Sequence, residues 1–370
     1  MKTHPPDYPL IGTLAILISL GVLILVSVSA VLSQEKFDYP TYYWFHQISY
    51  GLIPGLILAF LAFKIPLSFL KKWAFTLFII NLIILGLVFA PKIGLQAGGA
   101  SRWINLGPLS LQPAEFLKVS FILYLAAWFS SIANPSAFRQ RKQKEFNIIL
   151  GAFLVIIGIL SIFLIFQPNI GTLGIIFAVA LLMYFAAGTP LWHTALIISM
   201  GIGLLFALIK IAPYRLSRFL VFVNPEIDPL GKGYQIKQAL IAIGSGGIFG
   251  LGLGLSRQKF GFLPQSIGDS IFAIFAEEGG FIGVIILISL FLFFVWRGFK
   301  ILKKAPDKFS QLAALGIVSW ISIQAFVNMG AMIGILPLTG IPLPFVSYGG
   351  SHLIAELIGV GILLNISKNT

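Results

Sequence analysis

Cysteine is absent from this chain, and charge is scarce. Without a single Cys among its 370 residues, the chain cannot form a disulfide, a thiolate nucleophile or a cysteine metal site. Charged residues make up 10% of the chain and hydrophobic residues 58%, whereas a soluble domain carries roughly 25% charge. This composition excludes a soluble globular protein and predicts an integral membrane protein.

Acidic residues are scarcer than basic ones. The chain has 12 Asp and Glu against 25 Lys and Arg, which gives a formal net charge of +13. Such an excess also occurs in nucleic-acid-binding proteins. Here, however, the basic residues lie mostly in short segments between apolar runs, as the positive-inside rule requires of membrane proteins. We therefore expect no nucleic-acid partner.

Ten apolar segments approach the length of about 20 residues that crosses a hydrocarbon core of about 30 Å. The expected spans cover residues 10–32, 45–63, 73–90, 114–132, 147–166, 170–187, 190–209, 269–296, 311–335 and 345–366. The sixth and seventh are separated only by Gly188, Thr189 and Pro190, but one continuous helix would extend about 60 Å, twice the bilayer core. The predicted fold class is an all-α integral membrane protein, with residues 1–370 in one polytopic domain.

The distribution of basic residues predicts the orientation. With both termini cytoplasmic, most Lys and Arg outside residues 210–268 fall in inside segments, whereas the short outside loops hold only Lys36, Lys92 and Arg102. The long loop, about residues 210–268, then lies outside between spans seven and eight. The outside also receives the Gly-, Pro- and Trp-rich segments 96–113, 167–172 and 337–351, so we expect function on that face.

Asp269 is the leading candidate for chemistry. It lies where the long loop meets span eight, and a carboxylate at the edge of an apolar segment is costly enough to need a reason. One interpretation is a helix N-cap, because Asp caps well and an anion suits the positive end of the helix dipole. The other is a general base facing an outer cavity, and the two are compatible.

Further acids and bases lie within the spans. At about 100° per residue, Glu277 lies about 80° and Glu278 about 180° around a helix from Asp269, so Glu277 is the better candidate for the same cavity. Both acids also suit buried pairing that fixes the bundle. Glu115 and Lys118 have the i, i+3 spacing of an intrahelical ion pair, and their alternative role is to line the cavity.

Basic residues of the outside segments suit an anionic lipid substrate. Guanidinium and ammonium groups bind phosphate, although some will contact only lipid head groups. The candidates are Arg102, Arg215, Arg218 and Lys259. His46, His193 and His352 have no metal-ligand spacing, so no protein metal site is expected. Gly246, Gly250 and Gly254 recur every four residues, which favours close backbone packing over a phosphate cradle.

Several ordered motifs resemble one known family. They include RWINLGP at 102–108, QPAEFLK at 112–118 and PFVSYGGS at 344–351, together with residues 167–172, 214–218, 233–235, 262–264, 269–273 and 276–278. In this order they resemble the SEDS family, which contains FtsW, RodA and SpoVE. Residues 256–264 look more like the FtsW division branch than the RodA elongation branch.

The resemblance implies an inverting peptidoglycan glycosyltransferase that polymerises lipid II at the outer face of the bacterial cytoplasmic membrane. A class B penicillin-binding protein is the implied partner, in cell division or cell shape. Asp269 corresponds to the family's catalytic aspartate. The expected substrate-binding residues are Arg102, Glu115, Lys118, Arg215, Arg218, Lys259, Glu277, Ser347 and Ser351. A divalent cation at the diphosphate stays open.

Two positions depart from the family pattern. Asn169 and Gln265 stand where many relatives carry Asp and Glu, so neither can act as a base here. Two other functions remain open from the sequence. A lipid flippase would use the intramembrane charges as a translocation path, and a non-catalytic division scaffold would use only a partner-binding face.

Overall fold

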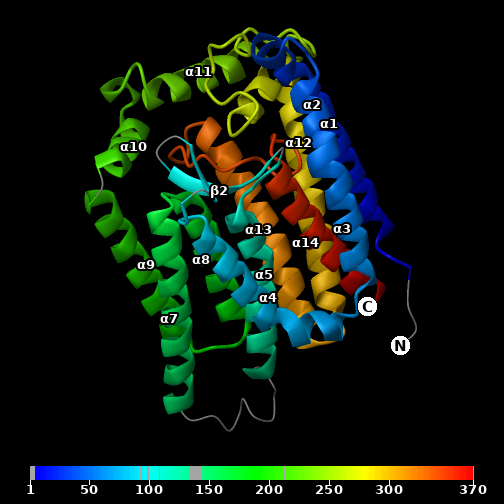
Figure 1. The fold of residues 1–370 in the computed structure, drawn as a ribbon, viewed down its shortest axis with the longest axis vertical. Coiled ribbons are helices and arrows are strands. Elements are labelled where there is room, and N and C mark those ends of the chain that lie inside the picture. The colour runs from blue at the N-terminus through cyan, green and yellow to red at the C-terminus, as the bar shows by residue number, and fades with distance from the viewer. Residues whose placement is uncertain are drawn as a thin grey trace.

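Long helices running side by side make up most of the computed structural model (Figure 1). The structure describes residues 5–91, 93–97, 100–107, 109–132, 143–211 and 213–369. The side chain of Arg215 lies outside the described part, so its predicted role has no structural counterpart.

All ten expected spans appear as helical segments. They are α1 (Tyr8–Phe37), the continuous run of α2 (Tyr42–Gln47), a π-helix (Ile48–Leu52) and α3 (Ile53–Lys64), α4 (Leu67–Leu87), α5 (Pro113–Ile132), α7 (Gln143–Phe166), α8 (Ile170–Ala186), α9 (Leu191–Ile211), α12 (Ile271–Lys304), α13 (Lys308–Met332) and α14 (Gly350–Lys368). Within the described ranges, nine are long and apolar enough to cross a membrane, and α8 is a shorter apolar helix of 17 residues. The predicted break between α8 and α9 is confirmed, and Gly188 adopts a positive φ of 84° there.

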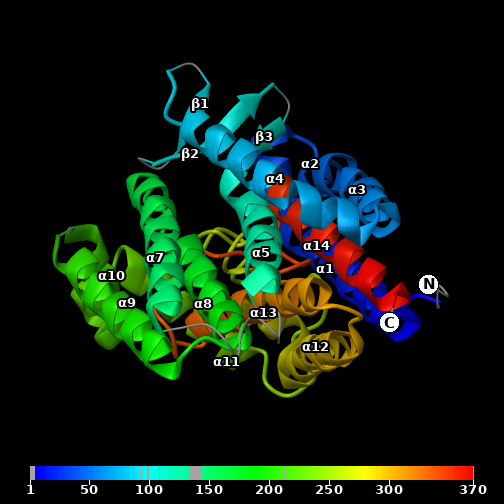
Figure 2. The same cartoon turned by 90° about the horizontal axis from the view of Figure 1, so that it is seen from below.

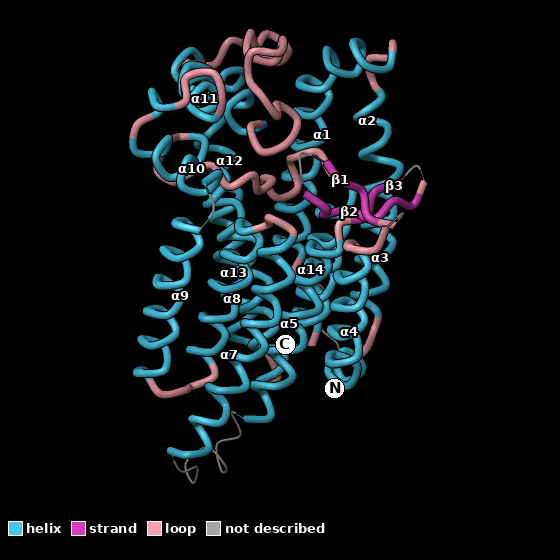
Figure 3. The backbone as a smooth tube through the Cα atoms, turned by 60° about the vertical axis from the view of Figure 1, so that its left-hand side comes forward, coloured by secondary structure: helices cyan, strands magenta, loops and turns pink. Residues whose placement is uncertain are grey.

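The two chain termini lie at the same end of the bundle (Figure 1). The opposite end carries α10 (Pro213–Val223), α11 (Lys232–Ser245) and the segments 246–270 and 333–349, and we call it the loop end (Figure 3). It also carries a small antiparallel sheet of β1 (Gly94–Ala97), β2 (Ala100–Leu106) and β3 (Leu109–Leu111), in the order β1-β2-β3. The sequence predicted a loop in this region. The hairpins instead satisfy its backbone hydrogen-bonding groups locally.

Helices α5, α13 and α14 form the centre of the bundle (Figure 2). Several of their large apolar side chains are fully buried, among them Phe121, Phe129 and Trp320. The surrounding helices α3, α4 and α9 expose many apolar side chains on their outer faces. Exposed apolar faces of this kind are suited to lipid rather than to water.

Helix α12 is broken at Gly280, which the sequence did not predict. Its 34 residues would extend about 51 Å as one straight helix, but Gly280 takes φ 61° and ψ −167°. Residues 247–252 run alongside the break, so that Leu251 N donates to Glu277 O (3.0 Å) and Phe281 N donates to Gly247 O (2.9 Å). The backbone groups freed by the break are thus satisfied by protein, as a break at membrane depth requires.

Glycines at 246 and 250 allow this segment to approach the backbone of α12 closely enough to pair with it. A Cβ atom on Gly246 would overlap the carbonyl oxygen of Ala276, and one on Gly250 would overlap that of Glu278. The packing prediction is therefore confirmed for these two glycines. Gly254 has nothing within 4 Å of an added Cβ, so the prediction is wrong there.

Candidate active site

Asp269 lies at the loop end, in the turn that leads into α12. The helix begins at Ile271, and its N-cap is Ser270, so the expectation that Asp269 caps the helix is wrong. Asp269 stands one residue earlier and is partly buried. It is nevertheless close to the positive end of the first half of α12.

Asn328 of α13 fixes the backbone of Asp269. Its Nδ2 donates both to Asp269 O and to Ile341 O, each at 2.8 Å. One buried amide therefore ties the Asp269 turn to the segment before α14. The sequence reasoning missed Asn328, although a lone Asn inside an apolar span is a recognisable signal.

Ser347 makes a second tie to the same turn. Its Oγ donates to Gly268 O at 2.7 Å and accepts from Leu343 N at 2.8 Å, and the side chain is fully buried. The neighbouring Tyr348 N donates to Ile267 O at 2.9 Å. The Ser347 hydroxyl thus holds backbone in this structure, and its predicted contact with substrate stays a prediction.

The surroundings of Asp269 raise its basicity. Burial raises the pKa of its carboxyl from the ordinary 3.8 to about 6. A hydrogen bond to its own backbone, the charge of Arg218, a hydrogen bond from Gln235 and one from the backbone of Ser270 act in the opposite direction. A carboxylate with a pKa of about 6 is still mostly ionised at neutral pH and takes up a proton more readily than an ordinary Asp.

Three elements converge on this carboxylate. Arg218 comes from α10, and its guanidinium also donates to Leu338 O at 3.5 Å. Gln235 comes from α11, and its Nε2 donates to Ser270 Oγ at 2.9 Å. Gly340, at φ 71°, passes close enough that an added Cβ would lie 3.8 Å from Asp269 Oδ2. Of the predicted basic candidates with described side chains, Arg218 is the one that interacts with Asp269.

Glu115 and Lys118 form the expected ion pair, at 2.8 Å. Both side chains are buried, and Lys118 Nζ also donates to Gln324 Oε1 at 2.8 Å. Gln324 Nε2 continues the network to Glu356 Oε1 (3.1 Å) and to Pro342 O (3.2 Å). A cavity beside Lys118, lined also by Phe121 and Trp320, has a volume of about 10 Å³, which is too small for a sugar.

This network supports the segment that leads to Asp269. Glu356 Oε2 accepts a hydrogen bond from Phe345 N at 2.9 Å, and Phe345 has a positive φ of 63°. His352 contacts Ser347 O through Nε2 at 3.0 Å. The buried Glu115–Lys118 pair and Glu356 thus hold residues 342–347 through Gln324, and Ser347 of that segment holds the Asp269 turn.

Glu277, Glu278 and Lys259 form a separate buried cluster. Lys259 Nζ lies 3.1 Å from Glu278 Oε1, and Ser27 Oγ donates to the same carboxylate at 2.7 Å. Glu277 accepts from Ser256 Oγ and from the N–H groups of Arg257 (3.1 Å) and Gln258 (3.3 Å). These groups fasten the long loop to the broken helix. Lys259 and Glu277 are therefore engaged by protein groups in this structure, and their predicted contact with substrate stays a prediction.

Arg102 and Ser351 also bind protein backbone. Arg102 Nε donates to Gln167 O at 3.0 Å and its Nη2 to Pro168 O at 2.5 Å, which ties β2 to the turn before α8. Ser351 Oγ donates to Ser110 O at 3.1 Å and accepts from Gln112 N at 3.0 Å. Both residues therefore help to hold the backbone of the loop end in place.

The two departures from the family pattern fall in turns. Gln265 has a positive φ of 54°, and its carbonyl accepts from Gly268 N (2.9 Å) and Ser270 N (3.3 Å), so it shapes the Asp269 turn. Asn169 is buried at the start of α8. Among the residues described, no group of three or more His, Asp or Glu side chains is arranged to hold a metal ion.

Comparison with known proteins gives a consistent result. The cell cycle protein family of FtsW, RodA and SpoVE matches residues 8–370. Stage V sporulation protein E of Bacillus subtilis is 38% identical over 368 residues, which cover 99% of this chain and 98% of that protein. A probable peptidoglycan glycosyltransferase FtsW of Coxiella burnetii is 39% identical over 360 residues, covering 96% and 94%.

Solved structures share the fold. A chain from a study of how a peptidoglycan synthase complex coordinates polymerization and crosslinking superposes with a TM-score of 0.74 and 27% identity, covering 98% of both chains. The rod shape determining protein RodA of Thermus thermophilus superposes with a TM-score of 0.70 and 27% identity, covering 98% of this chain and 97% of that one.

Proposed function

The chain belongs to the family of FtsW, RodA and SpoVE, and from this we propose that it is a peptidoglycan glycosyltransferase acting in cell division or cell shape. Its substrate is lipid II, which it polymerises into glycan strands. The observation that carries this proposal is the partly buried Asp269 carboxylate at the loop end, with its raised pKa of about 6 and its interaction with Arg218.

Asp269 acts as the general base. It accepts the proton of the acceptor sugar's 4-hydroxyl while that oxygen attacks the anomeric carbon of the donor. The new glycosidic bond forms as the bond to the lipid-linked diphosphate breaks, and the diphosphate leaves with the electron pair. Attack from the face opposite the leaving group inverts the anomeric carbon. The leaving diphosphate needs no general acid, unlike the sugar that a glycosidase releases.

Arg218 is the basic group best placed to assist. Its guanidinium keeps Asp269 more ionised than burial alone would. The same cation is suited to bind the diphosphate, whose charge grows as the bond breaks. A general base typically contributes about 10²–10⁴-fold, so charge stabilisation must supply a large part of the remaining rate.

The test is polymerisation of labelled lipid II by the purified protein. Asp269→Asn should lower the rate by at least about 10²-fold, because the amide cannot accept the proton. Glu226→Gln is the matched control, since it neutralises an exposed acid of the same long loop and should leave the rate unchanged. A folded Asp269→Asn protein that polymerises at the wild-type rate would disprove the base assignment. Transport of lipid II without polymer would instead indicate a flippase.

We further propose that the loop end faces the outside of the bacterial cytoplasmic membrane and that both termini are cytoplasmic. Because the chain has no Cys, single Cys residues can report the orientation. Leu230→Cys, at an exposed loop-end position, should react with a membrane-impermeant maleimide on intact cells. Lys71→Cys, at the start of α4, should react only after permeabilisation. The reverse pattern would invert the proposed topology.

The proposed partner is a class B penicillin-binding protein that cross-links the product. The supporting observation is the likeness to a chain from a peptidoglycan synthase complex. Polymerisation assays with and without the cognate transpeptidase test whether the rate depends on it. Failure of the two purified proteins to associate would remove the partner proposal and leave the polymerase proposal intact.

A further inference from the structure

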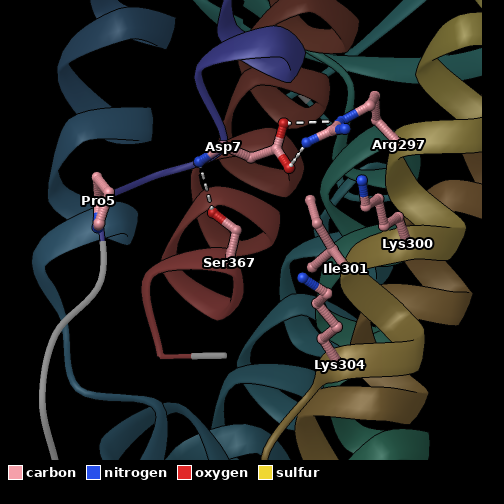
Figure 4. Close-up of a pocket in the computed structure, with 7 residues that line it drawn as sticks. All are labelled: Pro5, Asp7, Arg297, Lys300, Ile301, Lys304 and Ser367. Atoms are coloured by element: carbon pink, nitrogen blue, oxygen red, sulfur yellow. Dashed lines mark hydrogen bonds and ion pairs between the residues drawn. The ribbon is translucent and has the colours of Figure 1, made fainter.

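A basic pocket lies at the opposite end from Asp269, beside the chain termini. It has a volume of about 460 Å³, within the range of about 300–1,000 Å³ that is typical of small-molecule sites. Three segments distant in sequence meet there, namely the residues before α1, the last turns of α12 and the end of α14 (Figure 4). Its lining residues are Pro5, Asp7, Arg297, Lys300, Ile301, Lys304 and Ser367.

One ion pair closes the upper side of this pocket. The Arg297 guanidinium donates to both carboxylate oxygens of Asp7, from Nε to Oδ1 at 3.1 Å and from Nη2 to Oδ2 at 2.5 Å. Asp7 Oδ1 also accepts from Leu10 N at 3.0 Å and so caps α1, while Asp7 N donates to Ser367 Oγ at 3.2 Å. The single acid of the pocket is therefore already engaged by a guanidinium and a helix N-terminus.

Two ammonium groups are left without an acidic partner. Lys300 and Lys304 are exposed, and Figure 4 shows both side chains directed from α12 toward the space beside Asp7. In the part of the chain that the structure describes, neither forms an ion pair. The four charged side chains that line the pocket leave a net positive charge after the Asp7–Arg297 pair is formed. The pocket is thus suited to an anion.

The surroundings favour a lipid anion over a soluble one. The Trp296 ring lies 5.3 Å from the Arg297 guanidinium and 5.5 Å from the Lys300 ammonium, and this side chain is 55% exposed. Such aromatic side chains concentrate at the membrane–water interface. Toward the middle of α12, Leu292 and Phe293 are exposed on the apolar surface and suit acyl chains. Basic pockets between the ends of membrane helices commonly bind phosphate head groups.

We propose that this pocket binds the phosphate of an anionic phospholipid, with Lys300 and Lys304 as its ligands and the acyl chains along α12. The bound lipid links α1, α12 and α14 at the end that carries the termini. This site is separate from the polymerisation chemistry and does not depend on Asp269.

Binding can be measured by native mass spectrometry of the full-length protein titrated with phosphatidylglycerol or phosphatidylcholine. Wild type should prefer phosphatidylglycerol. Lys300→Gln combined with Lys304→Gln should weaken that binding by about 25-fold, at about fivefold for each lysine near the surface. Lys71→Gln combined with Lys72→Gln is the matched control, because it removes the same charge from exposed positions at the same end. The control should weaken binding much less than the pocket double variant, because Lys71 and Lys72 do not line the pocket.

Three results would overturn the proposal. Equal losses in both double variants would show a general charge effect, and equal binding of the two lipids would exclude an anion site. Displacement of the lipid by inorganic phosphate at matched concentration would assign the pocket to a free anion. Lys300→Arg with Lys304→Arg should retain binding, and equal thermal unfolding of all variants in phosphatidylcholine alone shows that each is folded.

Discussion

The substitution Asp269→Asn, which removes the charge of this side chain, should stabilise the protein although it lowers the rate of polymerisation. Burial raises the pKa of this carboxyl from 3.8 to about 6 in the folded state. Folded protein therefore binds this proton more tightly than unfolded protein, so the contribution of Asp269 to stability is greatest below pH 3.8 and is lost as the pH rises through 6. At about 1.36 kcal/mol for each pH unit, the ionised carboxylate costs about 3 kcal/mol at neutral pH.

The Asn substitution removes this cost because its amide resembles the neutral acid. Asp269→Asn should therefore exceed wild type in stability by up to about 3 kcal/mol at pH 7, and most of this gap should disappear at pH 4, where the carboxyl is largely protonated in the folded protein. Thermal and denaturant unfolding of the purified protein at the two pH values measures the gap. Glu226→Gln, at an exposed acid, is the control and should show no such trend.

Two results would refute this reasoning. A variant that is less stable than wild type at pH 7 would mean that Asp269 makes a stabilising interaction that outweighs its burial. A stability gap that does not change with pH would mean that the carboxylate is not the group responsible. Gain of stability together with loss of polymerisation is expected of a catalytic group held in an unfavourable setting, and a purely structural residue would not give it.

Three further changes test the supporting structure. Arg218→Gln should shift the acid limb of the pH–rate profile to higher pH, because Arg218 lowers the pKa of Asp269, whereas Arg218→Lys should keep most of the wild-type profile. Gly250→Ala should destabilise the protein by about 1–3 kcal/mol, because Gly250 has a positive φ of 80° and an added Cβ would overlap the backbone carbonyl of Glu278 in α12. Gly244→Ala is the control and should have little effect, because nothing lies within 4 Å of its added Cβ. Ser347→Ala should cost about 1–3 kcal/mol and slow polymerisation without moving the pH profile, because it leaves two buried backbone groups unsatisfied.

The ten spans could be predicted because the bilayer imposes a simple rule on the sequence. Each crossing needs a long apolar helix, and each short connection between crossings is readable from Gly, Pro and charge, as at Gly188 between α8 and α9. The small sheet at Gly94–Leu111 escaped prediction because three short strands carry little periodicity in a polar loop.

The break in α12 could not be read from its own residues. Phe272 to Leu302 is continuously suited to a helix, and Gly280 is tolerated inside many membrane helices. What separates the helix is the pairing of residues 247–252 with its backbone, a contact between segments about thirty residues apart. The ion pair of Lys259 and Glu278 could not be predicted for the same reason, because Lys259 lies in the long loop and Glu278 in α12.

Asp269 itself was identifiable because an acid at the edge of an apolar span is conspicuous. Its partners were harder to find, since Arg218, Gln235 and Asn328 come from three other helices. Basic residues were all plausible phosphate ligands in the sequence. Only tertiary packing shows that Arg218 lies near the Asp269 carboxylate, whereas Lys259 forms an ion pair with Glu278.

The buried charges also bear on the choice between polymerase and transporter. A translocation path needs charged groups that a moving substrate can reach, whereas Glu115, Lys118 and Glu356 are almost fully buried and joined through Gln324. A buried pair keeps its charges only while every partner stays in place, since loss of one partner is strongly destabilising. The network ends on Pro342 O and Phe345 N, in the segment that holds the Asp269 turn. Rigid charges under a partly buried base suit an enzyme that must hold one carboxylate in position at the membrane surface.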